Sequence, residues 1–315
     1  MEQQAEQKPL VVVCGPTGSG KSALAVALAE RFSGEVVSCD SVQIYKHFEI
    51  GTAKITPAER RGIPHHLLDA AEPDAVFTAG DYARLARAAL HEISARGRLP
   101  VVAGGTGFYL RALLDGLFEG PPRNEALRAR LQAREARRPG SLHRLLGRWD
   151  TAAAARIHEN DTSKLTRALE VMLAEKQSLT NLFARGRDPL TGYRVLKLGL
   201  NPPRRELYQR IERRAREMFD RGLLEEVRAL IAQGWPTTVK PFESLGYAQA
   251  LACLNGIVTQ DQAIAETQMH TRRYAKRQWT WFRRERDMEW LDGFGAETAM
   301  QHAAIQRVAR FLAPD

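Results

Sequence analysis

Residues 10–22 read LVVVCGPTGSGKS, an apolar run that stops at a glycine-rich loop. Gly15, four further residues and then Gly20, Lys21 and Ser22 match the P-loop pattern G-x-x-x-x-G-K-[ST]. The apolar run predicts a strand and the alanine-rich stretch 22–32 predicts a helix, which is the context that this motif requires. The stretch therefore predicts a strand, a phosphate-binding turn and a helix.

The glycines of this loop allow backbone conformations that turn successive N–H groups into one concavity, at the positive end of the following helix. Lys21 is expected to neutralise the outer phosphate oxygens, and Ser22 to hold Mg²⁺, the expected cofactor, through its hydroxyl. The expected phosphate-binding residues are Gly15, Pro16, Thr17, Gly18, Ser19, Gly20, Lys21 and Ser22.

The motif alone does not name the reaction. P-loop hydrolases and kinases usually carry an acid at the end of another apolar strand, where it helps to hold the metal. The best match for that strand, 99–106 (LPVVAGGT), ends in glycines instead. This difference disfavours an ATPase.

Composition points to an anionic macromolecule as partner. The 315 residues include 46 Lys or Arg against 37 Asp or Glu, a net charge of +9, and the pI is about 9.7. Such an excess favours nucleic acid. Three scattered cysteines exclude a disulfide framework, and no apolar run suggests export or a membrane span. We expect a cytoplasmic monomer that does not contact membranes.

Residues 35–40 (EVVSCD) predict a second strand that ends at Asp40. The carboxyl ends of parallel strands share one edge of the sheet, so Asp40, Ser41 and Gln43 should face the bound phosphates. A carboxylate there can accept a proton from an incoming nucleophile. The alternative is that Asp40 only caps the following turn.

A second strand-turn-helix unit follows further along. Residues 81–96 predict a helix that Gly97 ends, and 99–103 predict a buried strand. The sequence then turns through 104–109 (GGTGFY), which repeats the P-loop arrangement without its lysine and places Thr106 on the same edge. Close packing alone would also explain this glycine turn.

The composition changes after Pro122. Residues 123–187 carry 14 Lys or Arg against 7 Asp or Glu, a net charge of +7, in helical periodicity. Residues 193–200 alternate and return the chain to the sheet. We predict an α/β fold, a P-loop NTPase-like parallel sheet flanked by helices. Its core, 1–120 and 191–315, would end in a helical RNA-contacting region, and a helical insertion at 121–190 would contact RNA.

The C-terminal part is helical and rich in arginine, with a break predicted at Gly222 in the stretch 204–233. Between residues 272 and 286 there are 7 basic residues against one acid, a net charge of +6, interleaved with four aromatic residues. Such a segment is typical of contacts with unpaired RNA. The alternative is an amphipathic helix that packs its aromatic residues inward. The two interpretations are compatible, because one side of a helix can pack inward while its basic side contacts RNA. We expect a core role for Trp281 and a phosphate contact for Arg277.

With these segments in place, the chain resembles the tRNA dimethylallyltransferases of the P-loop superfamily along nearly its whole length. The motifs that carry the resemblance are GPTGSGKS at 15–22, DSVQ at 40–43, GTAK at 51–54, PHHL at 64–67, GGTG at 104–107, RIH at 156–158 with RALE at 167–170, GLLEEV at 222–227, LGY at 245–247 and KRQWTWFR at 276–283.

The resemblance implies transfer of a dimethylallyl group from its diphosphate to N6 of the adenosine 3′ to the anticodon of tRNA, with the anticodon stem-loop as the partner. It implies that Asp40 is the base, that Thr17, Lys21 and Ser22 hold the diphosphate with Mg²⁺, and that Arg214 assists the leaving group. The positions that correspond to tRNA contacts are Asp40, Ser41, Val42, Gln43, Thr106, Arg128, Ser163, Lys164, Leu165, Thr166, Arg167, Glu243, Ser244, Leu245, Gly246, Tyr247, Ala248, Lys276, Arg277, Gln278, Trp279, Thr280, Trp281, Phe282 and Arg283.

Two departures from the family pattern affect loops outside this centre: Ile55 stands where proline is common, and 174–178 lacks the usual glycine. Two other functions remain open from the residues alone, a P-loop nucleoside or nucleotide kinase and an RNA-dependent NTPase. The basic segments disfavour the first, and the missing acid disfavours the second.

Overall fold

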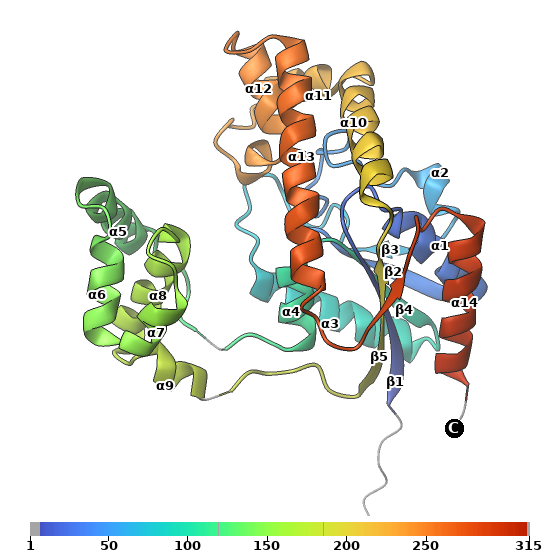
Figure 1. The fold of residues 1–315 in the computed structure, drawn as a ribbon, viewed down its shortest axis with the longest axis horizontal. Coiled ribbons are helices and arrows are strands. Elements are labelled where there is room, and N and C mark those ends of the chain that lie inside the picture. The colour runs from blue at the N-terminus through green and yellow to red at the C-terminus, as the bar shows by residue number, and fades with distance from the viewer. Residues whose placement is uncertain (1–6, 119, 185, 314–315) are drawn as a thin grey trace, which may run out of the picture. The chain divides into compact units, whose positions relative to one another are not determined.

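A parallel sheet forms the centre of the fold (Figure 1). The computed structural model describes residues 7–118, 120–184 and 186–313. The strands are β1 (Lys8–Cys14), β2 (Gly34–Cys39), β3 (His65–His66), β4 (Leu99–Gly104), β5 (Tyr193–Leu200) and β6 (Met288–Leu291). They lie in the order β3-β2-β4-β1-β5-β6, and each neighbouring pair is parallel. The predicted α/β class is confirmed, with the P-loop strand β1 inside the sheet.

The contacts between residues divide the molecule into two compact units, of which the smaller spans Asp115–Pro189. The unit that contains the sheet also contains α1 (Lys21–Arg31), α2 (Pro57–Arg60), α3 (Ala79–Ala95), α4 (Gly107–Leu114), α10 (Arg204–Asp220), α11 (Leu223–Ala232), the 3₁₀ helix η1 (Lys240–Glu243), α12 (Tyr247–Leu254), α13 (Gln260–Phe282) and α14 (Thr298–Leu312). None of the helices in the described part of the chain has the length and apolarity to cross a membrane.

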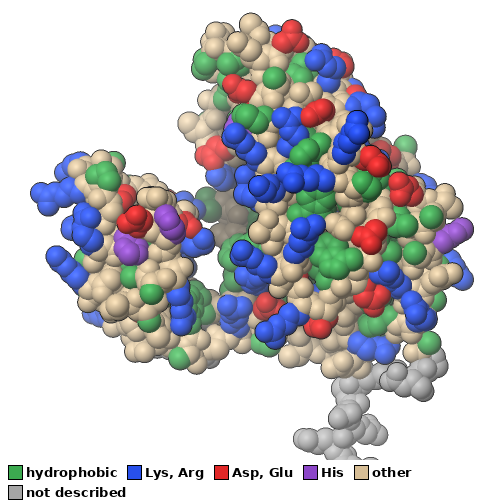
Figure 2. Space-filling view, viewed as in Figure 1, with side chains coloured by type: hydrophobic (Ala, Val, Ile, Leu, Met, Phe, Trp, Pro, Cys, Tyr) green, Lys and Arg blue, Asp and Glu red, His purple; other side chains and the backbone are tan. Residues whose placement is uncertain are grey.

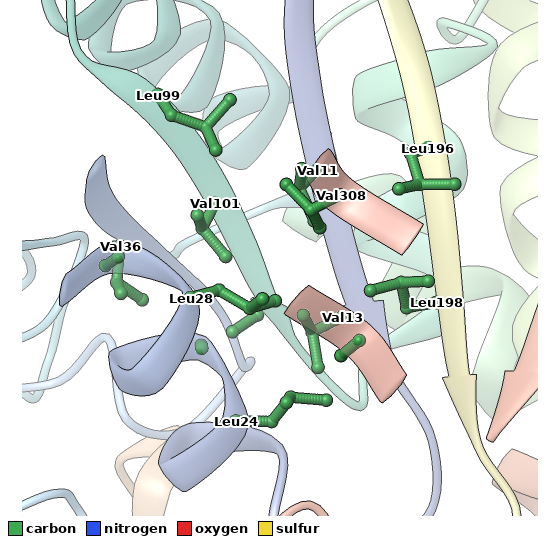
Figure 3. Packing of buried hydrophobic residues seen from close by; sticks show 14 of the residues in the cluster. Val11, Val13, Leu24, Leu28, Val36, Leu99, Val101, Leu196, Leu198 and Val308 are labelled. Carbon is green, nitrogen blue, oxygen red and sulfur yellow. The ribbon is translucent and has the colours of Figure 1, made fainter. Parts of the chain in front are cut away.

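The sheet is covered on both faces, by α1 and α14 on one and by α3 and α4 on the other, while α10–α13 stand beyond the carboxyl ends of its strands (Figure 1). Figure 3 shows the first face, where Val11 and Val13 of β1 meet Leu24 and Leu28 of α1 and Val308 of α14. Each fully buried side chain of this size stabilises the fold by about 1.5–3 kcal/mol. This packing holds the strand that leads into the P-loop.

A second core ties the loop after β2 to the helices beyond the sheet. Phe48 of that loop packs edge-on against Phe242, with ring centroids 5.2 Å apart, and against Tyr247, at 4.8 Å. Gly222, with φ 96°, separates α10 from α11, so the predicted break is confirmed. The residues around Asp40 are thereby held on a rigid support.

The smaller unit is helical and consists of α5 (Glu125–Arg137), α6 (Ser141–Trp149), α7 (Thr151–Arg156), α8 (Thr162–Glu175) and α9 (Leu179–Ala184). Its own core includes Leu142, Leu146, Leu165 and Leu169. Asp150 accepts from Ala153 N at the start of α7 and from Thr180 N, which joins α7 to α9. No strand occurs in its described residues, as the helical periodicity predicts. The domain limits at residues 121 and 190 remain predictions.

Candidate functional site

The P-loop residues form an open cradle of backbone donors between β1 and α1. Gly18 and Gly20 have φ values of 80° and 88°, a region that favours glycine, and they turn the chain sharply before α1. The N–H groups of Gly18, Gly20, Lys21 and Ser22 form no hydrogen bond with any residue that the structure describes. Because α1 adds its positive end, the cradle fits an anion such as a phosphate group.

The segment between β6 and α14 closes over this loop from the other end of the sequence. Gly295 N donates to Ser19 O at 2.9 Å. A Cβ on Gly20 would lie 2.9 Å from Ala296 N, so the close approach of the two backbones requires a residue without a side chain at position 20. The conformation of the cradle therefore depends on the last elements of the chain as well as on the motif.

Two cations and one carboxylate interact beside the cradle. Lys21 Nζ donates to Pro16 O at 2.8 Å. Burial lowers the pKa of Lys21 from 10.5 to about 8; Asp40 opposes this shift, and the positive charge of Arg214 adds to it. Burial likewise lowers the pKa of Arg214, again against the attraction of Asp40. Positive charge is thus concentrated in a partly dehydrated place, where it attracts anions strongly.

Asp40 follows β2, as predicted, and its two carboxylate oxygens differ. Oδ1 accepts from Val42 N at 2.9 Å and from Gln43 N at 3.2 Å, which is the turn cap considered above. Oδ2 accepts no hydrogen bond from the described residues. The capping role therefore holds Asp40 in place and leaves one oxygen available to a ligand, so the two interpretations are compatible.

A cavity of about 360 Å³ opens beside Asp40. Of the predicted site residues it is lined by Thr17, Asp40, Ser41, Val42, Arg214, Glu243, Ser244, Leu245 and Arg277, and it is also lined by Gly51, Thr52, Ile211, Ala215, Met218, Thr267, Thr271 and Tyr274, which the sequence analysis missed. For the three residues on α10, a signal was available in the sequence: apolar residues at 211, 215 and 218 share one face of a helix. The cavity combines charged groups at one side with an apolar wall.

The second glycine turn lies against the P-loop, joined to it by Gln278 of α13. Gln278 Oε1 accepts from Thr17 N at 2.7 Å, and its Nε2 donates to Gly105 O at 2.8 Å. Thr106 Oγ1 accepts from Ser41 N at 3.1 Å, so Thr106 also lies on the predicted edge. The glycine turn at 104–107 therefore packs closely against the P-loop and also lies at the candidate site.

The helix α13 has an inner and an outer side. Trp279 and Phe282 are buried with Gln278, and Trp279 Nε1 donates to Asn201 Oδ1 at 3.1 Å. Trp281 is partly buried against Gly107, with the guanidinium of Arg111 4.3 Å above its ring. The exposed residues are Lys276, Arg277, Thr280 and Arg283, and Figure 2 shows Lys and Arg side chains gathered over α10 and α13. Only this outer side of the segment 276–283 is open to a partner.

Several other residues predicted to contact tRNA are occupied within the fold. Tyr247 and Gly246 are buried, as are Leu165 and Thr166 of the smaller unit. Arg128 and Arg167 both pair with the buried carboxylate of Glu170, at 3.2 and 2.7 Å. Ser163 and Lys164 are exposed, and Lys164 pairs with Asp161 at 2.5 Å.

A half-buried carboxylate that holds the loop after β2 was not foreseen. Glu226 of α11 accepts from Ile50 N at 2.8 Å, from Glu49 N at 3.3 Å and from the Tyr247 hydroxyl, which itself accepts from Gly51 N at 3.2 Å. Burial raises the pKa of Glu226. This network fixes the loop whose residues Gly51 and Thr52 line the cavity.

Ser22 is the residue predicted to hold a metal ion. Within the described residues, no three His, Cys, Asp or Glu side chains come together as a metal site. Ser22 is exposed at the start of α1, and its hydroxyl has no hydrogen-bond partner in the described chain. Mg²⁺ commonly takes most of its ligands from water and substrate phosphates, so one hydroxyl beside the cradle fits this ion.

Comparison with known proteins agrees with this geometry. A family model described as IPP transferase matches residues 43–285. The chain is 60% identical over 304 residues to a tRNA dimethylallyltransferase of Solibacter usitatus, covering 96% of this chain and 99% of that protein. It is 55% identical over 298 residues to the tRNA dimethylallyltransferase of Koribacter versatilis, covering 94% and 97%.

Solved structures give the same result. The full-length tRNA isopentenylpyrophosphate transferase of Bacillus halodurans matches with a TM-score of 0.71 and 36% identity, covering 97% of this chain and 96% of that one. A eukaryotic dimethylallyltransferase solved in the course of acting on tRNA matches with a TM-score of 0.82 and 26% identity, covering 98% and 80%. The resemblance found in the sequence is therefore confirmed, and the chain belongs to the IPP transferase family, that of the tRNA dimethylallyltransferases.

Proposed function

We propose that this protein transfers the dimethylallyl group of dimethylallyl diphosphate to N6 of the adenosine 3′ to the anticodon of a tRNA and releases diphosphate. The observation that carries the proposal is the arrangement around one cavity of about 360 Å³. Asp40 and Arg214 line the cavity, Lys21 interacts with both, and the N–H groups of Gly18, Gly20, Lys21 and Ser22 have no partner among the described residues. A leaving-group site and a proton acceptor thus lie together.

In the proposed reaction, the bond between C1 of the dimethylallyl group and the diphosphate oxygen breaks, and a bond from C1 to the adenine nitrogen forms. The proton lost from that nitrogen goes to Asp40, whose Oδ2 is open to it. Lys21, Arg214 and the N–H groups at the start of α1 stabilise the charge that develops on the departing diphosphate. Thr17, which lines the same cavity, contributes its hydroxyl to the diphosphate.

Magnesium fits the site as the expected cofactor. Ser22 would hold the ion through its hydroxyl, and the ion supplies charge neutralisation to the diphosphate when it is bound. The apolar wall that Ile211, Ala215 and Met218 provide suits the hydrocarbon part of the donor. An adenine must leave its stack to reach this cavity, so extrusion of the base is part of the proposal.

For the RNA, the proposed contacts are the residues that are both predicted and accessible. In the larger unit these are Lys276, Arg277, Thr280 and Arg283 on the outer side of α13, with Glu243 and Ser244 at the cavity. In the smaller unit they are Ser163 and Lys164, and there the arginines at 128 and 167 would shape the surface through Glu170. We further propose a monomer that works in the cytoplasm, which agrees with three free cysteines.

One assay tests the reaction directly. Dimethylallyl diphosphate labelled in the prenyl group is incubated with Mg²⁺ and an unmodified tRNA that carries adenosine 3′ to its anticodon, and with the same tRNA carrying guanosine there. The label should enter only the first RNA and release one diphosphate for each group transferred. Parallel reactions receive γ-labelled ATP. Label transfer from ATP to a nucleoside, or RNA-dependent phosphate release without prenyl transfer, would replace the proposal by a kinase or an NTPase.

A further inference from the structure

Two of the backbone donors of the P-loop are already used. Ser19 N donates to Pro16 O at 3.3 Å within the loop itself. Thr17 N donates to Gln278 Oε1 at 2.7 Å, whereas Gly18, Gly20, Lys21 and Ser22 keep their N–H groups free of the described residues. The phosphate-binding cradle therefore begins at Gly18, and the donor at its front end is blocked by a side chain from α13.

By the general P-loop pattern, the blocked donor would lie at the end of the cradle where the outer phosphates bind. The lysine of a P-loop reaches the outer phosphate groups of its ligand. Here the ammonium of Lys21 donates to Pro16 O at 2.8 Å, directly beside Thr17. A third phosphate would extend to this place, where it would meet the amide of Gln278 in place of a free N–H. Asp40, which lines the cavity with Thr17, adds charge repulsion.

The amide of Gln278 cannot readily move away. Gln278 is 5% exposed, and its Nε2 donates to Gly105 O at 2.8 Å. A Cβ at position 105 would overlap this nitrogen, so the glycine there makes room for the amide. Breaking either hydrogen bond would leave a buried polar group without a partner, which is costly. The obstruction is thus built from α13, the P-loop and the second glycine turn together.

We propose that Gln278 is a specificity-determining residue that limits this P-loop to diphosphates and excludes triphosphates such as ATP. The inference rests on the proposed function, in which the ligand of the cradle is a diphosphate, and it adds the residue that rejects the longer ligand. It removes a donor by accepting from Thr17 N, and its buried amide bridges the P-loop and the second glycine turn, where a third phosphate would need space.

The test compares inorganic pyrophosphate with inorganic tripolyphosphate in the presence of Mg²⁺, with dissociation constants from titration calorimetry. The variants are Gln278→Ala, which frees both the N–H and the space, and Gln278→Met, which frees the N–H and keeps the volume. The matched control is Gln268→Ala on the same helix, whose Nε2 donates to Glu212 O at 3.0 Å and which forms no hydrogen bond with the P-loop in the described chain.

We expect the preference of the wild-type protein for pyrophosphate over tripolyphosphate to fall by about tenfold or more in Gln278→Ala, as one regained hydrogen bond to an anion implies. It should fall less in Gln278→Met and stay unchanged in Gln268→Ala. An unchanged ratio in both Gln278 variants, or an equal loss of both ligands, would overturn the inference. Failure of the proposed function would be seen separately: the wild-type protein would not bind pyrophosphate, or it would not transfer the prenyl group.

Discussion

The depressed pKa of Lys21 predicts that donor binding weakens as the solution becomes more alkaline. With a pKa of about 8 in the free protein, the ammonium is about three-quarters protonated at pH 7.5 and about one-tenth protonated at pH 9. If the bound diphosphate requires the charged form, its affinity should fall roughly eightfold over this interval. An unshifted lysine, with a pKa of 10.5, would leave the affinity nearly constant.

The assay is titration with an unreactive thiolo analogue of dimethylallyl diphosphate at constant Mg²⁺ and ionic strength, from pH 7.5 to 9. The terminal phosphate of this ligand is already ionised in that range, so its own titration adds little. Lys21→Arg keeps the charge and should give a flat profile, and Lys21→Met should bind weakly at every pH. A flat profile for the wild-type protein, or the same decline in Lys21→Arg, would refute the assignment of this titration to Lys21.

The lowered pKa of Lys21 affects the stability of the fold in the opposite direction: stability rises with pH where donor binding falls. The folded protein holds the Lys21 proton less tightly than the unfolded chain, so between the two pKa values the unfolded state binds more protons. The contribution of Lys21 to the free energy of unfolding should therefore rise from about pH 8 to about pH 10.5 in the ligand-free protein. Chemical denaturation of the wild type against Lys21→Met isolates this contribution.

Three further predictions concern the remaining parts of the site. Asp40→Asn keeps the turn cap and removes the proton acceptor, so single-turnover prenyl transfer should fall roughly 10²- to 10⁴-fold with little change in tRNA affinity; a near-normal rate would make Asp40 purely structural. Arg277→Ala should weaken tRNA binding and flatten its salt dependence by up to about one unit, whereas insensitivity to both salt and this change would leave the basic side of α13 a solvated surface. Trp281→Ala should lower the melting temperature, through a loss of up to about 3 kcal/mol of packing against Gly107 and Arg111; weakened tRNA binding at an unchanged melting temperature would instead indicate base stacking.

Much of the sheet was predictable because long apolar runs and glycine turns mark its interior strands. The predicted strand at 193–200 coincides with β5, and β4 begins at the predicted Leu99. The edge strands β3 and β6 were missed, since two and four residues are too few to show a periodicity. Their partners, β2 and β5, supply the register that their own sequences cannot specify.

The site was predictable only where a motif or a strand end marks it. Lys21 follows from the P-loop motif. Asp40 and Thr106 follow from their places after two strands, because the carboxyl ends of parallel strands meet. Gln278 and Glu226 act through contacts with residues far away in the sequence, and nothing local distinguishes a buried glutamine or a half-buried glutamate from an exposed one. The net charge of 272–286 identified α13 as basic, but only the packing tells which of its residues face inward.

The contact between Gly295 and Ser19 also has a consequence for the synthesis of the protein. The P-loop leaves the ribosome well before the segment that closes over it, because Ser19 precedes Gly295 by most of the described chain. A nascent chain that has emerged only through Arg283 carries every motif on which the family resemblance rests, but it lacks the backbone that shapes the cradle. We expect such chains, and products cleaved after Phe282, to bind diphosphate poorly, so that incomplete protein does not sequester the prenyl donor.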